Sequence, residues 1–157
     1  MDKNEYTIIL FYKFGIIKNP EKFKDTQRKI AESFNLKGRI IIAEEGINAT
    51  LEGKTKDIKS YIKKLKSIKF FKDVVFKDSE GIGSGFTKLK VKVRPEIVTL
   101  GVGKLNIKKD TASVVTAKKL EKMYEKNEDF VVLDLRNDFE IEVGYFEKTI
   151  NPQTYKF

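Results

Sequence analysis

The segment KLKVKVR, residues 88–94, alternates cations with apolar side chains. Side chains of an extended strand alternate between its two faces, so the cations share one face. Neighbouring cations there are about 6–7 Å apart, a spacing comparable to that of phosphates along a nucleic-acid strand. We therefore predict a nucleic-acid contact by Lys88, Lys90, Lys92 and Arg94. The alternative is the polar side of a half-buried strand, where like charges repel one another at a small cost.

Two adjacent acids, Glu44 and Glu45, precede a glycine in AEEGINATLEG, residues 43–53. Paired carboxylates can serve as general acid and base, or bind a cation. The alternative is a charged hairpin turn, in which Asn48 bonds nearby backbone and Gly46 and Gly53 adopt unusual dihedral angles. The spacing alone favours the turn.

Glycines alternate in DSEGIGSGF, residues 78–86, as they do in some phosphate-binding loops. A Walker loop needs Gly-Lys-Ser/Thr directly before a helix, whereas this stretch leads into a strand. We therefore favour a mobile loop beside a binding surface, with Gly83 and Gly85 as candidate loop residues.

Asp134 and Arg136 follow a short apolar run in LDLRND, residues 133–138. Polar residues at the carboxyl end of a parallel strand often face a ligand crevice. The alternative is a structural pair, or bonds from both side chains to the loop backbone.

The composition excludes several kinds of chemistry. The 157 residues contain no Cys and no His, which excludes disulfides, thiolate nucleophiles, and Ser-His-Asp or Cys-His catalysis within this chain. No metal site of the usual zinc type is expected, and no cofactor is evident. No segment approaches the roughly 18 apolar residues of a membrane span, and the polar start MDKNEY is not typical of a signal peptide. We therefore expect a cytoplasmic protein with no membrane contact.

The net charge of +9 is unevenly distributed. Residues 1–109 carry 25 Lys/Arg against 13 Asp/Glu, whereas residues 110–157 carry 7 against 10. This change suggests a boundary near residue 110 and a polyanionic partner, such as RNA, for the first part. A lysine-rich solvated surface is the alternative.

Hydrophobic periodicity predicts the elements of the first part. β-Branched and aromatic runs predict strands at 6–14, 36–45 and 46–53, and Arg39 in the second is a further candidate RNA contact. Apolar residues at three- and four-residue spacing predict helices at about 20–35 and 55–67. The resulting β-α-β-β-α-β order is ferredoxin-like, and such a sheet can leave one face open for nucleic acid. The sequence leaves open whether 73–80 or 88–94 is the fourth core strand, or whether the two form a hairpin.

The second part starts a different kind of domain. Thr116 is predicted to cap a helix that ends near Asn127. An apolar strand is predicted at 130–135, and wholly apolar strands are typical of parallel sheets that are covered on both faces. We predict a domain at 1–105, a linker at 106–115 and an incomplete α/β domain at 116–157. Because one strand and one helix cannot bury both faces of the strand, self-association through this part is expected.

Three stretches together resemble one family: GRIIIAEEGINATLEG, KLKVKVRPEIVTLG and VVLDLRNDFEIEVGYFEKTINP. They are similar, in the same order, to the bacterial rhodanese-domain tRNA uridine hydroxylases. The resemblance implies an α+β protein in which an acylphosphatase-like N-terminal domain, of ferredoxin-like topology, precedes a rhodanese-like domain. It also implies tRNA as the partner and oxygen-dependent hydroxylation of the wobble uridine, with molecular oxygen as co-substrate.

The sequence departs from this family at several positions. The family's reactive cysteine lies beyond the Asp-x-Arg motif, and no residue of this chain matches it, so we expect the 157 residues to be inactive alone. Asp134 and Arg136 match the motif, and the resemblance implies that they lie at the rim of the active site. Glu140 matches it too, and the resemblance implies a structural role for this residue. Tyr145 replaces a usual His, and Lys148 and Thr149 replace a usual Gly-Ala. A non-catalytic RNA-binding module or a protein-interaction domain is the alternative function.

Overall fold

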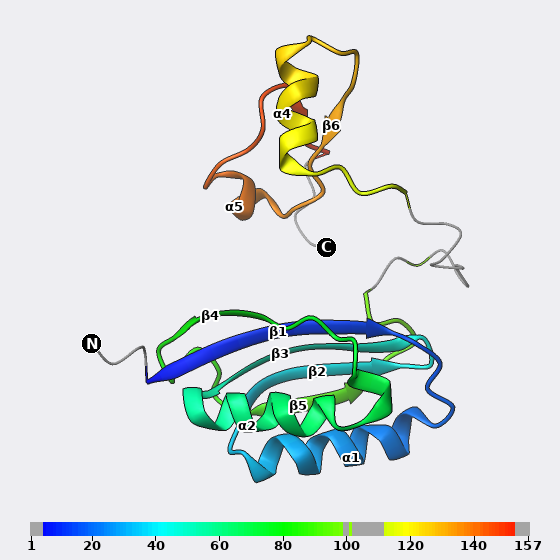
Figure 1. The fold of residues 1–157 in the computed structure, drawn as a ribbon, viewed down its shortest axis with the longest axis vertical. Coiled ribbons are helices and arrows are strands. Elements are labelled where there is room, and N and C mark those ends of the chain that lie inside the picture. The colour runs from blue at the N-terminus through cyan, green and yellow to red at the C-terminus, as the bar shows by residue number, and fades with distance from the viewer. Residues whose placement is uncertain (1–4, 99–100, 102–111, 153–157) are drawn as a thin grey trace. The chain divides into compact units, whose positions relative to one another are not determined.

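The computed structural model describes residues 5–98, 101 and 112–152. The chain divides into two compact units, Met1–Leu100 and Gly101–Phe157, called unit 1 and unit 2 below. Figure 1 shows the elements of each unit. Of the linker predicted at 106–115, residues 106–111 lie outside the described residues.

Unit 1 is a five-stranded sheet with two helices on one face (Figure 1). The sheet order is β4-β1-β3-β2-β5. This order, with β1–α1–β2–β3–α2–β4 along the chain, confirms the predicted ferredoxin-like arrangement. In chain order the elements are β1 (Tyr6–Phe14), α1 (Pro20–Ser33), β2 (Lys37–Ala43), β3 (Gly46–Lys54), α2 (Thr55–Lys66), the 3₁₀ turn η1 (Lys69–Phe71), β4 (Lys77–Gly81) and β5 (Leu89–Val93).

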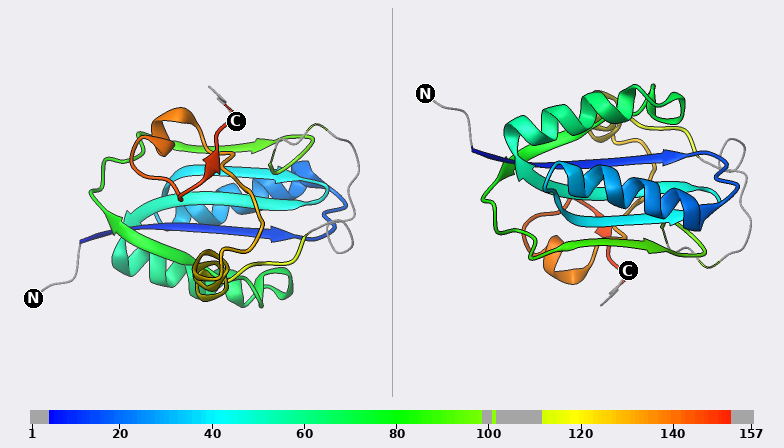
Figure 2. Two further views of the ribbon diagram at one scale, coloured as in Figure 1. Left: turned by 90° about the horizontal axis from the view of Figure 1, so that it is seen from above. Right: turned by 90° about the horizontal axis from the view of Figure 1, so that it is seen from below.

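The fourth core strand is β4, and β5 is an addition at the opposite edge (Figure 2). β4 pairs antiparallel with β1, from Tyr6 opposite Gly81 to Leu10 opposite Lys77. β5 pairs parallel with β2. The hairpin alternative is therefore wrong, because three strands separate the two segments. β4 also begins later than residue 73, since η1 and buried Val74 occupy the chain after α2.

Local signals set the ends of α1. The side chain of Asn19 accepts a hydrogen bond from the backbone N–H of Lys22 at 3.0 Å, and Pro20 occupies the first helical turn. Both features favour a helix start at this point. Beyond the helix, Asn35 has φ +54°, a left-handed conformation that turns the chain toward β2.

The core lies between the sheet and the helices. Alternate residues of the central strands, including Ile9, Phe11 and Leu51, are fully buried there. Burying such a side chain stabilises the fold by roughly 1.5–3 kcal/mol. Phe11 also packs edge-on against Phe71 of η1, with ring centroids 6.2 Å apart. Burial raises the pKa of the Tyr61 phenol, which has no hydrogen-bond partner among the residues that the structure describes.

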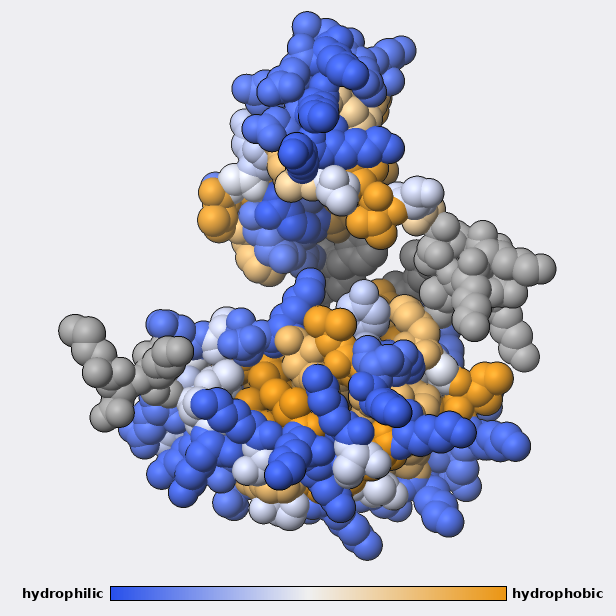
Figure 3. Space-filling model, viewed as in Figure 1, coloured by the Kyte–Doolittle hydropathy of each residue, from blue (hydrophilic) through white to orange (hydrophobic). Residues whose placement is uncertain are grey.

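A groove of about 930 Å³ separates α2 from β4. Apolar side chains form part of its surface, and the space-filling view shows apolar atoms in this region (Figure 3). Lys59 and Lys66 border it from α2, and Asp78 and Glu80 from β4. The groove therefore carries charges of both signs.

A glycine is required at the β2–β3 turn. Gly46 has φ +153°, and a Cβ added there would lie 2.2 Å from the carbonyl oxygen of Lys13. A larger residue would push β1 away from β3, because the two strands pair at Phe14 and Gly46. The unusual dihedral angle predicted for Gly46 is present, whereas Gly53 has no positive φ and its predicted unusual angle is absent.

The described residues of unit 2 form two short helices and two very short strands. These are α4 (Ala117–Glu125), β6 (Val132–Leu133), α5 (Asp138–Ile141) and β7 (Thr149–Ile150). β6 and β7 pair in parallel, but β6 is shorter than the strand predicted at 130–135. The side chains of Val131, Leu133 and Leu135 remain exposed rather than covered on both faces. The sequence pattern did not predict α5 or β7.

In the part of the chain that the structure describes, no helix has the length and apolar character needed to span a bilayer.

Candidate nucleic-acid interface

The sheet face away from α1 and α2 is called the open face. Strand register assigns Lys90 and Lys92 of β5 to it, beside Arg39 and Ile41 of β2. The alternate side chains of β5 face the helices and are partly or fully buried; these are Leu89, Val91 and Val93. The alternation predicted from KLKVKVR is therefore present in the structure.

Cations dominate the charge of the open face. Within the described strands, register places one acidic side chain on it, that of Glu52. The cations that share this face are Lys37, Arg39, Lys54, Lys77, Lys90 and Lys92. Such a surface attracts a polyanion.

The candidate RNA contacts fall together at the β5 edge. Arg39 lies directly opposite Lys90 in the register. Lys88 and Arg94 flank β5, and both are exposed. The backbone N–H of Arg94 donates to the carbonyl of Ile42 at 2.9 Å, which extends the pairing of the two strands. Among the described residues, none of these five cations has an ion-pair partner within 4.0 Å.

Sequence reasoning missed an aromatic part of the open face. Leu10, Tyr12 and Phe14 of β1 are 40%, 57% and 37% exposed. The rings of Tyr12 and Phe14 meet edge-to-face, with centroids 6.0 Å apart. The signal is the alternation within YTIILFYKF, where Ile9 and Phe11 are buried and their neighbours are not.

Of the paired acids at the β2–β3 turn, Glu45 has a structural role in unit 1, and Glu44 is exposed. The Glu45 carboxylate accepts the backbone N–H of Ile97 at 2.8 Å, and the Asn48 amide donates to the Ile97 carbonyl at 3.4 Å. The bond from Asn48 is therefore long-range rather than local to the turn. Among the described residues, no three Asp or Glu side chains gather as a metal site would require.

The glycine loop after β4 closes around a carboxylate of the protein itself. Glu52 is 2% exposed, and its oxygens accept the backbone N–H groups of Ile82, Gly83 and Phe86 at 3.0, 2.9 and 3.3 Å. Gly83 has φ +76°, and a Cβ there would meet the ring of Tyr6 at 2.8 Å. A loop with N–H groups that converge on an anion resembles a phosphate cradle. Here Glu52 occupies it, and Gly85 lies close to the same carboxylate.

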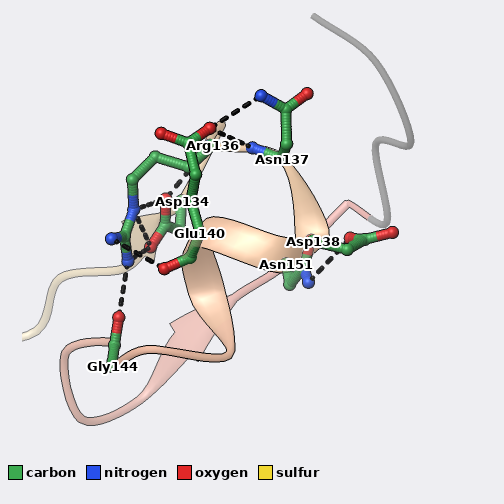
Figure 4. Close-up of polar contacts among 7 residues, drawn as sticks. All are labelled: Asp134, Arg136, Asn137, Asp138, Glu140, Gly144 and Asn151. Carbon is green, nitrogen blue, oxygen red and sulfur yellow. Dashed lines mark hydrogen bonds and ion pairs between the residues drawn. The ribbon is translucent and has the colours of Figure 1, made fainter. Parts of the chain in front are cut away.

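Asp134 and Arg136 form a clamp in unit 2 (Figure 4). Arg136 donates to both carboxylate oxygens of Asp134, with its shortest contact at 2.6 Å. The same guanidinium donates to the carbonyls of Glu140 and Gly144 at 3.2 and 2.7 Å. The clamp closes the 136–144 loop, as the structural alternative predicted. The Glu140 carboxylate accepts the backbone N–H of Asn137 at 3.1 Å, which supports the start of α5.

One departure from the resembled motif coincides with an unusual backbone conformation. Lys148, at a position where the resemblance leads us to expect Gly, has φ +58°. This left-handed region favours glycine. The backbone at position 148 therefore has the conformation that the expected glycine would adopt, although the residue in this chain is Lys. Tyr145 is exposed, and within the described part of the chain the Thr149 hydroxyl has no hydrogen-bond partner.

The clamp gives unit 2 a dependence on pH. The hydrogen bonds from Arg136 hold the pKa of Asp134 below its usual range. A carboxyl with a lowered folded-state pKa contributes stability that is complete above its unfolded pKa, about 3.9, and lost as pH falls through the folded value. We expect the 136–144 loop to loosen below about pH 4. Amide exchange of Gly144 as a function of pH measures this.

Asp134→Asn provides the matched variant for this prediction. It should show fast Gly144 exchange already near neutral pH, while Asp129→Asn, at an exposed site, should behave like the unchanged protein. Equal pH profiles for Asp134→Asn and the unchanged protein would contradict the role given to the clamp.

Comparison with known proteins gives these features a family context. The sequence model for the UPF0176 acylphosphatase-like domain matches residues 6–97. Proteins named tRNA uridine(34) hydroxylase from Corynebacterium kroppenstedtii, Acholeplasma laidlawii and Bacillus licheniformis are 42%, 39% and 40% identical to this chain. The alignments cover 94%, 100% and 99% of this chain, but 52%, 49% and 48% of those proteins. The chain thus spans about half the length of the curated relatives it matches.

Solved acylphosphatases align with a smaller part of the chain. The enzyme from Bacillus subtilis covers 55% of this chain at 13% identity, with a TM-score of 0.44. The enzyme from Coxiella burnetii covers 58% at 16% identity, with a TM-score of 0.40.

Proposed function

This chain belongs to the UPF0176 family, as the sequence resemblance predicted, and we propose that it is the N-terminal portion of a tRNA uridine(34) hydroxylase. The observation that carries the proposal is the identity of about 40% to proteins of that name along essentially the whole chain. In this proposal unit 1 binds tRNA in the cytoplasm, and molecular oxygen is the co-substrate.

The charge of the open face supports tRNA binding by unit 1. Register brings Arg39, Lys90 and Lys92 together at one edge of the sheet, and Glu52, the acid on this face, is bonded to the glycine loop. Phosphate contacts made by such cations supply most of the affinity for a nucleic acid and make it strongly dependent on salt.

The chemical step is assigned to residues outside this chain. The 157 residues include no cysteine, and Asp134, the acid of the Asp-x-Arg motif, is engaged by Arg136. In the complete protein these two side chains would lie at the rim of the reacting site and hold its loop, without reacting themselves.

The proposal predicts binding without turnover. The 157-residue protein should bind an unmodified tRNA, with a log-log slope against salt of roughly −0.7 to −0.9 for each phosphate contacted. Fluorescence anisotropy between 50 and 300 mM salt measures this slope. Mass spectrometry of tRNA incubated with the protein in air should detect no hydroxylated wobble uridine. Salt-independent binding would contradict the assignment of unit 1, and turnover would contradict the need for the cysteine.

A second candidate function, a protein-interaction domain, is favoured by unit 2. Its described residues expose several large apolar side chains, among them Val131, Val143 and Phe139. Self-association through this surface is the simplest form of that function. Light scattering on the preparation used for tRNA binding reports the oligomeric state directly.

A further inference from the structure

The aromatic side chains of β1 occupy an unusual position for a sheet surface. Tyr12 and Phe14 project on the open face while their neighbours Phe11 and Lys13 have the opposite parity. Large aromatic side chains are normally buried, because each removes 150–250 Å² of surface from water. Two of them in contact on a polar face suggest a ligand.

A hollow of about 460 Å³ lies beside these rings. β4 reaches β1 only as far as Leu10, opposite Lys77, so register gives β1 no neighbour on that side from Phe11 to Phe14. The hollow is lined by Leu10, Phe11, Tyr12, Lys13, Phe14, Asp73, Val75 and Lys77. Planar apolar groups can therefore approach the two rings from the side that β4 leaves uncovered.

Strand register connects this hollow to the basic edge. One row across the sheet runs from Tyr12 through Asn48 and Ile41 to Lys92. The neighbouring row runs from Leu10 through Thr50 and Arg39 to Lys90. Each of these two rows therefore has an apolar or aromatic end at β1 and a cationic end at β5. Three strand spacings of about 4.8 Å separate the two ends.

We infer that Tyr12 and Phe14 stack on unpaired bases of an RNA strand whose phosphates lie along Arg39, Lys90 and Lys92. The inference rests on the proposed function, because it presumes that RNA binds the open face. A strand with its backbone at the β5 edge directs its bases inward, toward β1. Bases in a duplex are already stacked and paired, so this site selects single-stranded RNA, such as a loop.

The charge of the open face argues for RNA rather than a second protein as the ligand. An interface core between proteins is depleted of charged residues, especially Lys. Here the aromatic pair shares its sheet face with lysines: Lys77 lies opposite Leu10 on the β4 side, and the β5 lysines lie at the far end of the rows. A positively charged surface that also carries exposed aromatic side chains is typical of single-strand binding proteins.

The test compares single-stranded and double-stranded RNA on the full chain. A labelled ten-nucleotide RNA and a blunt duplex of the same length are titrated with the unchanged protein and with Tyr12→Leu/Phe14→Leu. Leucine keeps the apolar character and removes the aromatic faces. We expect the double variant to lose at least about tenfold in affinity for the single strand and to keep its affinity for the duplex, with an unchanged salt slope.

The reciprocal variant Tyr12→Phe/Phe14→Tyr keeps both rings and should bind like the unchanged protein. Circular dichroism establishes that each variant is folded. If a folded Tyr12→Leu/Phe14→Leu protein binds the single strand normally, stacking is overturned. A change of its oligomeric state by light scattering, with its RNA affinity intact, would also overturn stacking and make the patch a protein contact.

Failure of the proposed function would look different. In that case neither RNA would bind with a salt-dependent affinity, and removing lysines of β5 would change nothing. Binding that depends on Lys90 and Lys92 but not on the two rings would overturn the stacking inference alone.

Discussion

Replacing Lys90, Lys92 and Arg94 together with alanine is expected to weaken tRNA binding roughly a hundredfold at 0.1 M salt. All three side chains are exposed at the β5 edge and have no ion-pair partner among the described residues. Removing one cation–phosphate pair lowers the log-log salt slope by roughly 0.7–0.9, so the slope of the triple variant should be smaller by about two to three. Anisotropy titrations across a salt series measure both the affinity and the slope.

The matched control removes the same charge from the helix side of unit 1. Lys63, Lys64 and Lys69 are exposed on α2 and η1, so their replacement with alanine lowers the net charge equally. If net charge alone drives binding, the two triple variants will weaken it equally. A reduced slope in the β5 variant alone assigns the contact to the open face, and an unchanged slope there would remove β5 from the interface.

Replacing Glu52 with alanine is expected to destabilise unit 1 by roughly 2–4 kcal/mol and to release the glycine loop. The buried carboxylate accepts the backbone N–H groups of Ile82, Gly83 and Phe86. Hydrogen bonds to a charged acceptor contribute about 1.5–3 kcal/mol each, but water can reach part of this loop and replaces some of the loss. Urea unfolding gives the stability, and amide exchange of the three donors reports the loop.

Glu80→Gln is the control for Glu52→Ala. Glu80 lies on the nearby strand β4, is exposed and accepts none of these loop bonds, so its replacement should change stability by less than about 0.5 kcal/mol. If Glu52→Ala leaves the three amides protected, another interaction holds the loop and the role of the carboxylate is wrong.

The sequence predicts most of unit 1 because its local signals agree with its tertiary contacts. The apolar alternation at 6–14 and the Asn19-Pro20 start correspond to β1 and α1, whose bounds are Tyr6–Phe14 and Pro20–Ser33. The parity of KLKVKVR also predicted which side chains of β5 are exposed. In each of these segments, one local pattern determines both the element and the face that it buries.

Features that depend on distant partners were not predictable. Nothing near Glu52 in the sequence indicates that its carboxylate reaches a loop some 30 residues later. The place of β5 depends on pairing with β2 across about 50 residues, which hydrophobic periodicity does not encode. That β4 leaves Tyr12 and Phe14 without a strand neighbour on one side depends on where β4 begins, and the residues of β1 do not carry that information.

In unit 2 the apolar run at 130–135 predicted more strand than forms. The structure has Val132–Leu133 as β6, because β7 pairs with only these two residues. The motif residues were more informative about structure than about chemistry. Asp134 and Arg136 close their own loop. That arrangement follows from a carboxylate and a guanidinium group two residues apart at the end of a strand.

The edge position of β5 links recognition to local unfolding. Within the described sheet, β5 is bonded to β2 alone, although its inward side chains pack against α1 and Val91 belongs to the core. An edge strand of this kind opens at a lower free energy than the central strands, so the basic row can be lost while the rest of unit 1 stays folded. A ligand that binds only the docked strand suppresses this opening by mass action. Bound RNA would therefore keep β5 paired with β2, and hydrogen exchange in β5 would slow in proportion to RNA occupancy.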